Sequence, residues 1–172
     1  MGREAEVHYS MNPVIGRDAR VLILGSMPGH VSLMKQEYYA NPRNQFWPIM
    51  RELFGRSSEF MDYEDKCAFL MHQRITLWDT IHRCTREGSL DSAIHDEEPN
   101  DLPGFLEKNA GIRLIVFNGT KSFAVFRKYF KEEPIGQRDL VCLPSTSPTP
   151  GKYSKTYAEK LKEWAIIRNY LL

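Results

Sequence analysis

The stretch "RVLILGSMPGHVSLMKQEYYANPRNQFW", residues 20–47, decides how the rest of the sequence is interpreted. It begins with a short apolar run that ends at a glycine, a pattern typical of a buried strand. The run leads into the turn "GSMPG", residues 25–29, and then into a segment rich in aromatic and amide side chains. We therefore predict a strand over residues 20–25 that is followed by a binding loop.

The same pattern recurs further along the chain. Short apolar runs followed by polar turns predict three more strands, over residues 75–81, 112–119 and 139–145. Helical spacing of apolar residues predicts helices over residues 45–55, 62–74, 101–110, 120–130 and 154–172. Residues 1–19 are expected to be irregular, and residues 82–102 to be a loop with a short helix around residues 89–94.

Strands that alternate with helices predict an α/β fold. We expect a three-layer αβα arrangement with a central four-stranded, mostly parallel sheet. Residues 1–172 are expected to form a single domain, since this length suits one hydrophobic core. In open sheets of this class the ligand crevice lies beyond the carboxyl ends of the strands. The residues that follow each strand are therefore the candidate site.

Composition narrows the class of protein without identifying it. The chain is 42% apolar and 26% charged, as in ordinary globular proteins, and its net charge of +1 neither requires nor excludes a nucleic-acid partner. Three scattered cysteines and five histidines lack the spacing of disulfide frameworks or metal sites. No apolar stretch is long enough for a membrane span. We expect a cytoplasmic monomer without a metal, a cofactor or a membrane partner.

The turn at residues 25–29 matches no common nucleotide-binding motif. It lacks the spacing of a dinucleotide loop and of a P-loop, and so does "NGTKS", residues 118–122. No Gly-x-Ser-x-Gly elbow is present either. These absences disfavour phosphate-cleaving chemistry and serine hydrolysis.

The aromatic loop holds the first candidate residues. Phe46 and Trp47 begin a helical stripe, which favours a place in the core. Tyr39 precedes "ANPRN", and either packing or stacking on a flat ligand fits that position. The position of Asn44 fits two roles equally well, the cap of the following helix and a polar contact in a binding site. A tyrosine face beside amide groups is what recognition of a nucleobase requires.

Further candidates follow the other strands. Trp78 and Asp79 end the second strand, where Asp79 suits a turn, a buried partner of an arginine or a site residue. Asn118 ends the third strand and fits either a turn or a ligand contact. After the fourth strand, hydroxyl and basic side chains suit phosphate oxygens, or alternatively an exposed loop and helix start. The candidates for DNA contacts there are Ser145, Thr146, Ser147 and Lys152.

Two of these segments together resemble the motifs of the uracil-DNA glycosylase superfamily. "GSMPG", residues 25–29, is similar to the first motif, and "LPSTSPT", residues 143–149, is similar to the second. "YYANPRNQFW", residues 38–47, has the spacing of the mismatch-specific branch. The Ser-Met form of the first motif with "PSTSP" in the second resembles the hypoxanthine-DNA glycosylase branch. The resemblance extends from about residue 20 to the final helix.

The sequence departs from that pattern at two positions. Relatives carry an Asn or Asp at the position of Met27, and the classical uracil enzymes carry a His at that of Leu143. Neither apolar side chain can activate water or donate to a leaving base. If the resemblance holds, it implies that Asn44 positions the water, that Asn118 contacts the base and that Asp79 serves either role.

The resemblance also implies an activity. It predicts a monofunctional DNA glycosylase that acts on damaged DNA, with hypoxanthine as first substrate and uracil or xanthine next. The flipped base would stack on Tyr39, while Gly25, Ser26, Met27 and Trp78 surround it. The apolar Met27 and Leu143 fit a second hypothesis, a catalytically silent nucleic-acid-binding module of the same fold. A small-molecule enzyme of the α/β class is the third.

Overall fold

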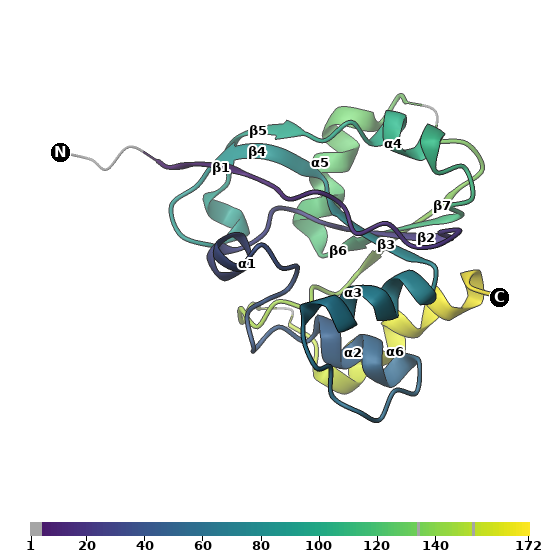
Figure 1. Cartoon of the computed structure of the whole chain (residues 1–172). Helices are drawn as coiled ribbons and strands as arrows, with labels where there is room; N and C mark the ends of the chain where they lie inside the picture. Colours follow the sequence, from purple (N-terminus) through teal and green to yellow (C-terminus); the bar gives the residue numbers. More distant parts are fainter. Residues whose placement is uncertain (1–4, 134, 153) are drawn as a thin grey trace.

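Four parallel strands form the central sheet, in the order β3-β2-β6-β7 (Figure 1). The computed structural model describes residues 5–133, 135–152 and 154–172. The strands are β2 (Val21–Gly25), β3 (Ile75–Asp79), β6 (Leu114–Asn118) and β7 (Asp139–Leu143). Asp79 lies opposite Gly25 in the register, and Leu143 lies opposite Asn118. The carboxyl ends of the four strands therefore meet at one edge, as predicted.

Helices cover both faces of this sheet. Alternate residues of a strand point to opposite faces, so Val21 and Ile23 pack with one set of helices and Leu22 and Leu24 with the other. The first set comprises α2 (Phe46–Leu53), α3 (Tyr63–His72) and α6 (Tyr157–Trp164). The second comprises α4 (Leu102–Lys108) and α5 (Thr120–Phe130). The predicted three-layer αβα fold is confirmed.

The helix ends follow from local chemistry. Asp62 accepts a hydrogen bond from the backbone N–H of Asp65, and this cap starts α3 where the sequence predicts it. Thr156 and Glu159 form a reciprocal capping box at the start of α6. The predicted final helix over residues 154–172 is shorter, because α6 gives way to the 3-10 helix Ala165–Tyr170.

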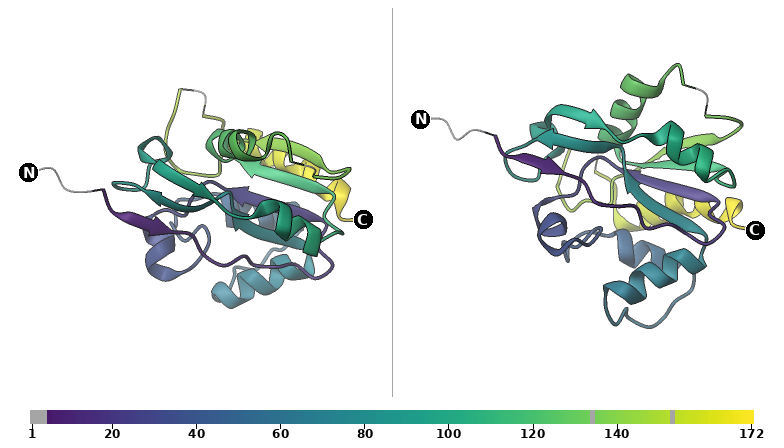
Figure 2. Two further views of the ribbon diagram at one scale, coloured as in Figure 1. Left: turned by 90° about the horizontal axis from the view of Figure 1, so that it is seen from above. Right: turned by 45° about the horizontal axis from the view of Figure 1, so that its top comes forward.

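A second sheet lies in a region that we predicted to be loop. It contains β1 (Val7–Tyr9), β4 (Ile81–Thr85) and β5 (His95–Pro99), all antiparallel, with β4 in the middle (Figure 2). The predicted strand over residues 75–81 is in fact two strands, and the chain changes sheets at Thr80. The predicted short helix is the 3-10 helix Asp91–Ala93. Pairing with β4, rather than an apolar pattern, makes the charged segment "HDEEP" a strand.

The segment between the turn and the aromatic loop is also more regular than predicted. It contains α1 (His30–Lys35), which begins directly after Gly29 and ends at Gln36 in a left-handed conformation. This short helix connects the turn at residues 25–29 to the aromatic loop.

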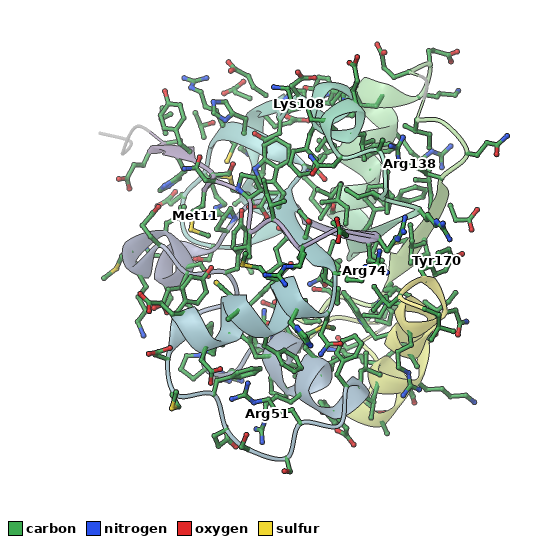
Figure 3. The ribbon with its side chains drawn as sticks, turned by 45° about the vertical axis from the view of Figure 1, so that its right-hand side comes forward. Met11, Arg51, Arg74, Lys108, Arg138 and Tyr170 are labelled. Carbon is green, nitrogen blue, oxygen red and sulfur yellow. The ribbon has the colours of Figure 1, made fainter. Side chains whose placement is uncertain are left out.

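The opposite edge of the central sheet carries basic side chains. Figure 3 labels Arg74 and Arg138, which directly precede β3 and β7 and so lie where parallel strands begin. Their guanidinium groups donate to backbone carbonyls of Asp18 and Ile112. Among the described residues, no helix is long and apolar enough to cross a membrane, and no cluster of three His, Cys, Asp or Glu side chains could hold a metal ion.

Candidate active site

A cavity of about 390 Å³ lies at the carboxyl edge of the central sheet. This volume falls in the range of small-molecule sites, roughly 300–1,000 Å³. Ten of the residues predicted from sequence line it: Gly25, Ser26, Met27, Tyr39, Asn44, Asp79, Asn118, Ser145, Thr146 and Ser147. Segments far apart in the chain therefore converge where the strand order predicts a ligand crevice.

Gly25 allows two polar side chains to approach the end of β2. A Cβ atom at this position would stand 2.6 Å from Asp79 Oδ1 and 3.4 Å from the Tyr39 hydroxyl oxygen. The first distance is too short for any real contact, so only glycine leaves room for the carboxyl group. The absent side chain at Gly25 thus places Asp79 and Tyr39 on the cavity wall.

Asp79 is the most unusual group of the cavity. It is 3% exposed, and its Oδ2 atom is buried with no hydrogen-bond partner among the described residues. Burial and the nearby charge of Asp91 together raise the pKa of Asp79 to about 8, against the lowering effect of Arg86. At neutral pH the carboxyl group is mostly protonated, so it can donate a hydrogen bond to a ligand in the cavity.

Tyr39 presents an aromatic face to the cavity. Its ring stacks on Phe46, with 4.2 Å between ring centroids, and its backbone has a φ of 55°, which is uncommon for an aromatic residue. The hydroxyl oxygen is buried without a hydrogen-bond partner in the described part of the chain. Burial, followed by the charge of Asp79, raises the pKa of Tyr39, so the phenol stays protonated. Phe46 and Trp47 lie in the core, as predicted.

Asn44 combines the two roles that its position suggests. Its Oδ1 atom accepts a hydrogen bond from the backbone N–H of Phe46, at 2.9 Å, and so supports the start of α2. Its side chain also lines the cavity. Because the carbonyl oxygen is held by the backbone, the orientation of the amide is fixed, and its NH₂ group can donate to a ligand or a water molecule.

Asn118 is held by the motif-two loop, residues 143–149. Its Nδ2 donates to Thr146 Oγ1 at 3.0 Å, and its Oδ1 accepts from the backbone N–H of Thr146 at 2.9 Å. Thr146 is fully buried, and its carbonyl accepts from the backbone N–H of Gln45. The second N–H of the Asn118 amide lies near the Tyr39 hydroxyl, where it partly offsets the effect of burial on the pKa of that phenol. The neighbouring Ser145 and Ser147 hydroxyls lie at the cavity wall.

The remaining turn residues are fixed in different ways. The Ser26 hydroxyl donates to Asp91 Oδ1 at 2.6 Å. Met27 is 6% exposed and packs with Ile81 and other apolar side chains in a small core of its own. Met27 therefore contributes packing, and the polar groups of the cavity wall come from other residues.

Two predicted residues do not line the cavity. Trp78 precedes Asp79 on β3, and neighbouring strand residues point to opposite faces. Its indole N–H donates to the carbonyl of Met11, and its ring packs on Phe105 with 4.8 Å between centroids. Lys152 is exposed and likewise absent from the cavity wall. The structure thus brings the other predicted residues together without these two.

Sequence reasoning missed one wall of the cavity. The segment after β4 contributes Ser89, Leu90, Asp91 and Ser92, and the aromatic loop adds Asn41. Ile81 and Cys84 are apolar, as expected of a strand, and the residues after them include Gly88 and several hydroxyl or acidic side chains. This composition is a weak sign of a loop that follows a strand. That sign does not reveal which surface the loop contacts.

The fold and the cavity together define a class of protein. The carboxyl edge of the parallel sheet carries the turn "GSMPG", residues 25–29, named the Gly-Pro-Gly turn after Gly25, Pro28 and Gly29. Together with a stacked tyrosine and a Pro-Ser loop, it has the arrangement expected of an α/β DNA glycosylase. The sequence profile of the Uracil DNA glycosylase superfamily matches residues 13–168. Because the match spans most of the chain, the protein belongs to that superfamily.

Individual relatives agree with this placement. A protein of Methanosarcina acetivorans named hypoxanthine DNA glycosylase is 40% identical over 158 residues, which cover 90% of this chain and 93% of the relative. A protein of Methanosarcina barkeri with the same name is 37% identical over 110 residues, covering 64% of this chain and 70% of the relative. The solution NMR structure of a Methanosarcina acetivorans protein assigned as a uracil DNA glycosylase has a TM-score of 0.80 and 37% identity, covering 96% of this chain and 99% of that one. The protein is a DNA glycosylase, a hydrolase of N-glycosyl bonds.

Proposed function

We propose that this protein removes hypoxanthine from DNA, with uracil and xanthine as further substrates. The observation that supports the proposal best is the convergence of Tyr39, Asn44, Asp79 and Asn118 on one cavity beside the Gly-Pro-Gly turn. Two relatives named hypoxanthine DNA glycosylase support the choice of the first base. The damaged nucleotide flips out of the duplex, because the target bond is otherwise inaccessible.

The protein recognises the base by stacking on its aromatic face and by hydrogen bonds to its edge. The Tyr39 ring, supported from behind by Phe46, stacks on the base. The second N–H of Asn118, which lies near the Tyr39 hydroxyl, and the carboxyl group of Asp79 contact ring nitrogens or carbonyl oxygens at the edge. The Tyr39 ring and the Asn118 amide are held by their neighbours before the base arrives, which lowers the entropic cost of recognition.

Bond cleavage follows from the groups around the base. The bond between the base nitrogen and the sugar C1′ breaks, its electron pair departs with the base, and the sugar passes through an oxocarbenium-like state. The protonated Asp79 and backbone N–H groups of residues 25–29 stabilise the negative charge that develops on the base. A water molecule held by Asn44 then adds to C1′ and releases one proton to solvent, while the departed base anion takes up a proton from solvent, which leaves an abasic site and the neutral free base.

Oligonucleotide cleavage tests the activity. Duplexes with a single inosine, uracil or xanthine are incubated with excess protein, and abasic products are converted to nicks by alkali. We expect nicking at inosine first and more slowly at uracil or xanthine. The silent-module hypothesis instead predicts salt-dependent DNA binding with no abasic product, and that result would contradict our proposal.

The Asn44→Ala variant tests the position of the water. We expect it to lose nearly all cleavage of inosine DNA, by about 10²–10³-fold, as when one fixed hydrogen-bond group of a site is removed. The Asn169→Ala variant, at an exposed asparagine of the C-terminal 3-10 helix, is the matched control and should retain full activity. Full activity of Asn44→Ala with an unchanged melting temperature would show that another group holds the water.

A further inference from the structure

The loop after β4, residues 86–92, makes two hydrogen bonds to the Gly-Pro-Gly turn and one to the start of α1. Arg86 Nη2 donates to the carbonyl of Pro28 at 2.5 Å, and the Ser26 hydroxyl donates to Asp91 Oδ1 at 2.6 Å. The backbone N–H of His30 donates to Ser89 Oγ at 2.9 Å. The loop thus holds both ends of the turn and the first residue of α1.

Arg86 is the most heavily buried member of this loop. Its side chain is 1% exposed, and its Nε and Nη1 atoms are buried without a hydrogen-bond partner among the described residues. The backbone is fixed on both sides, since its N–H donates to the Glu6 carbonyl and its own carbonyl contacts His8 Nε2. A buried guanidinium remains charged, and unpaired donors at such depth destabilise a fold. Arg86 is therefore poorly explained by stability alone.

The charge of Arg86 acts on the wall of the cavity. Asp79 is influenced by the carboxylate of Asp91 and the guanidinium of Arg86, while the phenols of Tyr38 and Tyr39 in turn experience the charge of Asp79. Arg86 is the cationic member of this group. It lies behind the Gly-Pro-Gly turn and does not line the cavity itself, so it acts on a ligand through that turn and through Asp79.

We propose that Arg86 is a positioning residue for base excision, which fixes the Pro28–Gly29 peptide and places a buried positive charge behind the departing base. This inference rests on the proposed glycosylase activity. A charged donor at the Pro28 carbonyl polarises that peptide and strengthens the N–H of Gly29, which belongs to the cavity wall. The same charge favours a leaving base that carries away an electron pair.

Substitution by methionine, lysine or glutamine separates charge from shape. Arg86→Met removes the charge with little loss of volume, Arg86→Lys keeps the charge, and Arg86→Gln keeps a donor for the Pro28 carbonyl. Arg83→Met is the matched control, because Arg83 lies on β4 only three residues before Arg86 and its ion pair with Glu98 is partly exposed. Each variant is assayed in single-turnover cleavage of inosine DNA with protein in excess, together with its melting temperature.

We expect Arg86→Met to lose about 10–100-fold in the cleavage rate, less than the 10²–10³-fold typical of a direct donor. Its melting temperature should equal or exceed that of the wild type, because replacing a buried charge by an apolar side chain is often neutral or stabilising. Arg86→Lys should recover more activity than Arg86→Gln, and Arg83→Met should match the wild type. A rate loss that merely follows a loss of stability across the variants would overturn the proposal.

A second measurement needs no substrate. The Asp79 carboxyl carbon is titrated by NMR in the wild type and in Arg86→Met, and loss of the positive charge should move its titration to higher pH. The alkaline limit of cleavage should move in the same direction. An unchanged Asp79 titration would overturn the electrostatic role of Arg86. If wild-type protein cleaves no inosine DNA yet the titration moves, the proposed function fails while the coupling of Arg86 to Asp79 stands.

Discussion

Asp79 and Asn118 end the two strands that flank β2, yet their surroundings differ. Asn118 uses both ends of its amide to hold Thr146 and so ties the motif-two loop to the sheet. Asp79 lies on the other side of Gly25 and has a buried oxygen with no partner among the described residues. Polar groups that build a wall are satisfied within the protein, whereas an unsatisfied buried group is costly and is expected where a ligand completes it.

Removal of the Asp79 carboxyl should have the largest effect. We expect Asp79→Ala to lower the single-turnover cleavage of inosine DNA by about 10²–10³-fold, the cost of one fixed donor to the leaving group. Asp79→Asn keeps a neutral donor and should remain within about 10-fold of the wild type. Rates measured at pH 7 with both variants check this difference, and equal losses in the two would contradict donation by Asp79.

The pH profile sharpens the same assignment. The protonated form of Asp79 is the donor, and its pKa is raised to about 8, so wild-type cleavage should fall as the pH rises through 8. Asp79→Asn has no such proton to lose, and its rate should stay level across that range. A rate that instead rises above pH 8 in the wild type would mean that the carboxylate, not the acid, takes part.

The sequence predicts features that depend on local patterns better than features that depend on contacts between distant segments. Apolar periodicity is a local property, and it correctly predicts the four central strands and the helices on both faces. The positions of Asp79 and Asn118 at the cavity follow from the carboxyl ends of those strands. The alternation of side chains along β3 also separates Asp79 from Trp78, a step that the sequence allows once the strand is known.

Other features depend on contacts between distant parts of the chain. The strand β5 is charged and exposed, and only its partner β4 identifies it as a strand. Arg86 is 58 residues from the carbonyl that it contacts, and nothing in the local sequence indicates that an arginine is buried there. Burial of a charged residue and the contact of a loop with a distant turn are properties of the assembled fold, so neither the burial of Arg86 nor the wall formed by residues 89–92 could be predicted.

Gly25 offers a way to disturb the Asp79 side of the cavity alone. In Gly25→Ala the new Cβ would stand 2.6 Å from Asp79 Oδ1, so the carboxyl group must move. We expect a loss of about 10–100-fold in the cleavage rate, below the cost of losing a fixed donor entirely. A double-mutant cycle with Asp79→Ala checks the cause, because the added methyl group should cost little once the carboxyl is absent. Additive losses would contradict this account.

Thr146→Val should have the smallest effect, since it alters the surroundings of Asn118, whose amide is hydrogen-bonded within the protein. The substitution removes the acceptor of Asn118 Nδ2 but retains the backbone N–H that donates to Asn118 Oδ1. A lost hydrogen bond of this kind costs about 1 kcal/mol, which corresponds to a decrease of roughly 2–4 °C in melting temperature. The cleavage rate should fall only a few-fold, because the second bond still orients the amide.

Thermal unfolding and single-turnover assays check both effects, with Thr149→Val, at an exposed hydroxyl of the same loop, as the stability control. An unchanged melting temperature would mean that Thr146 does not hold Asn118 in place, and the contrast with Asp79 would lose its basis.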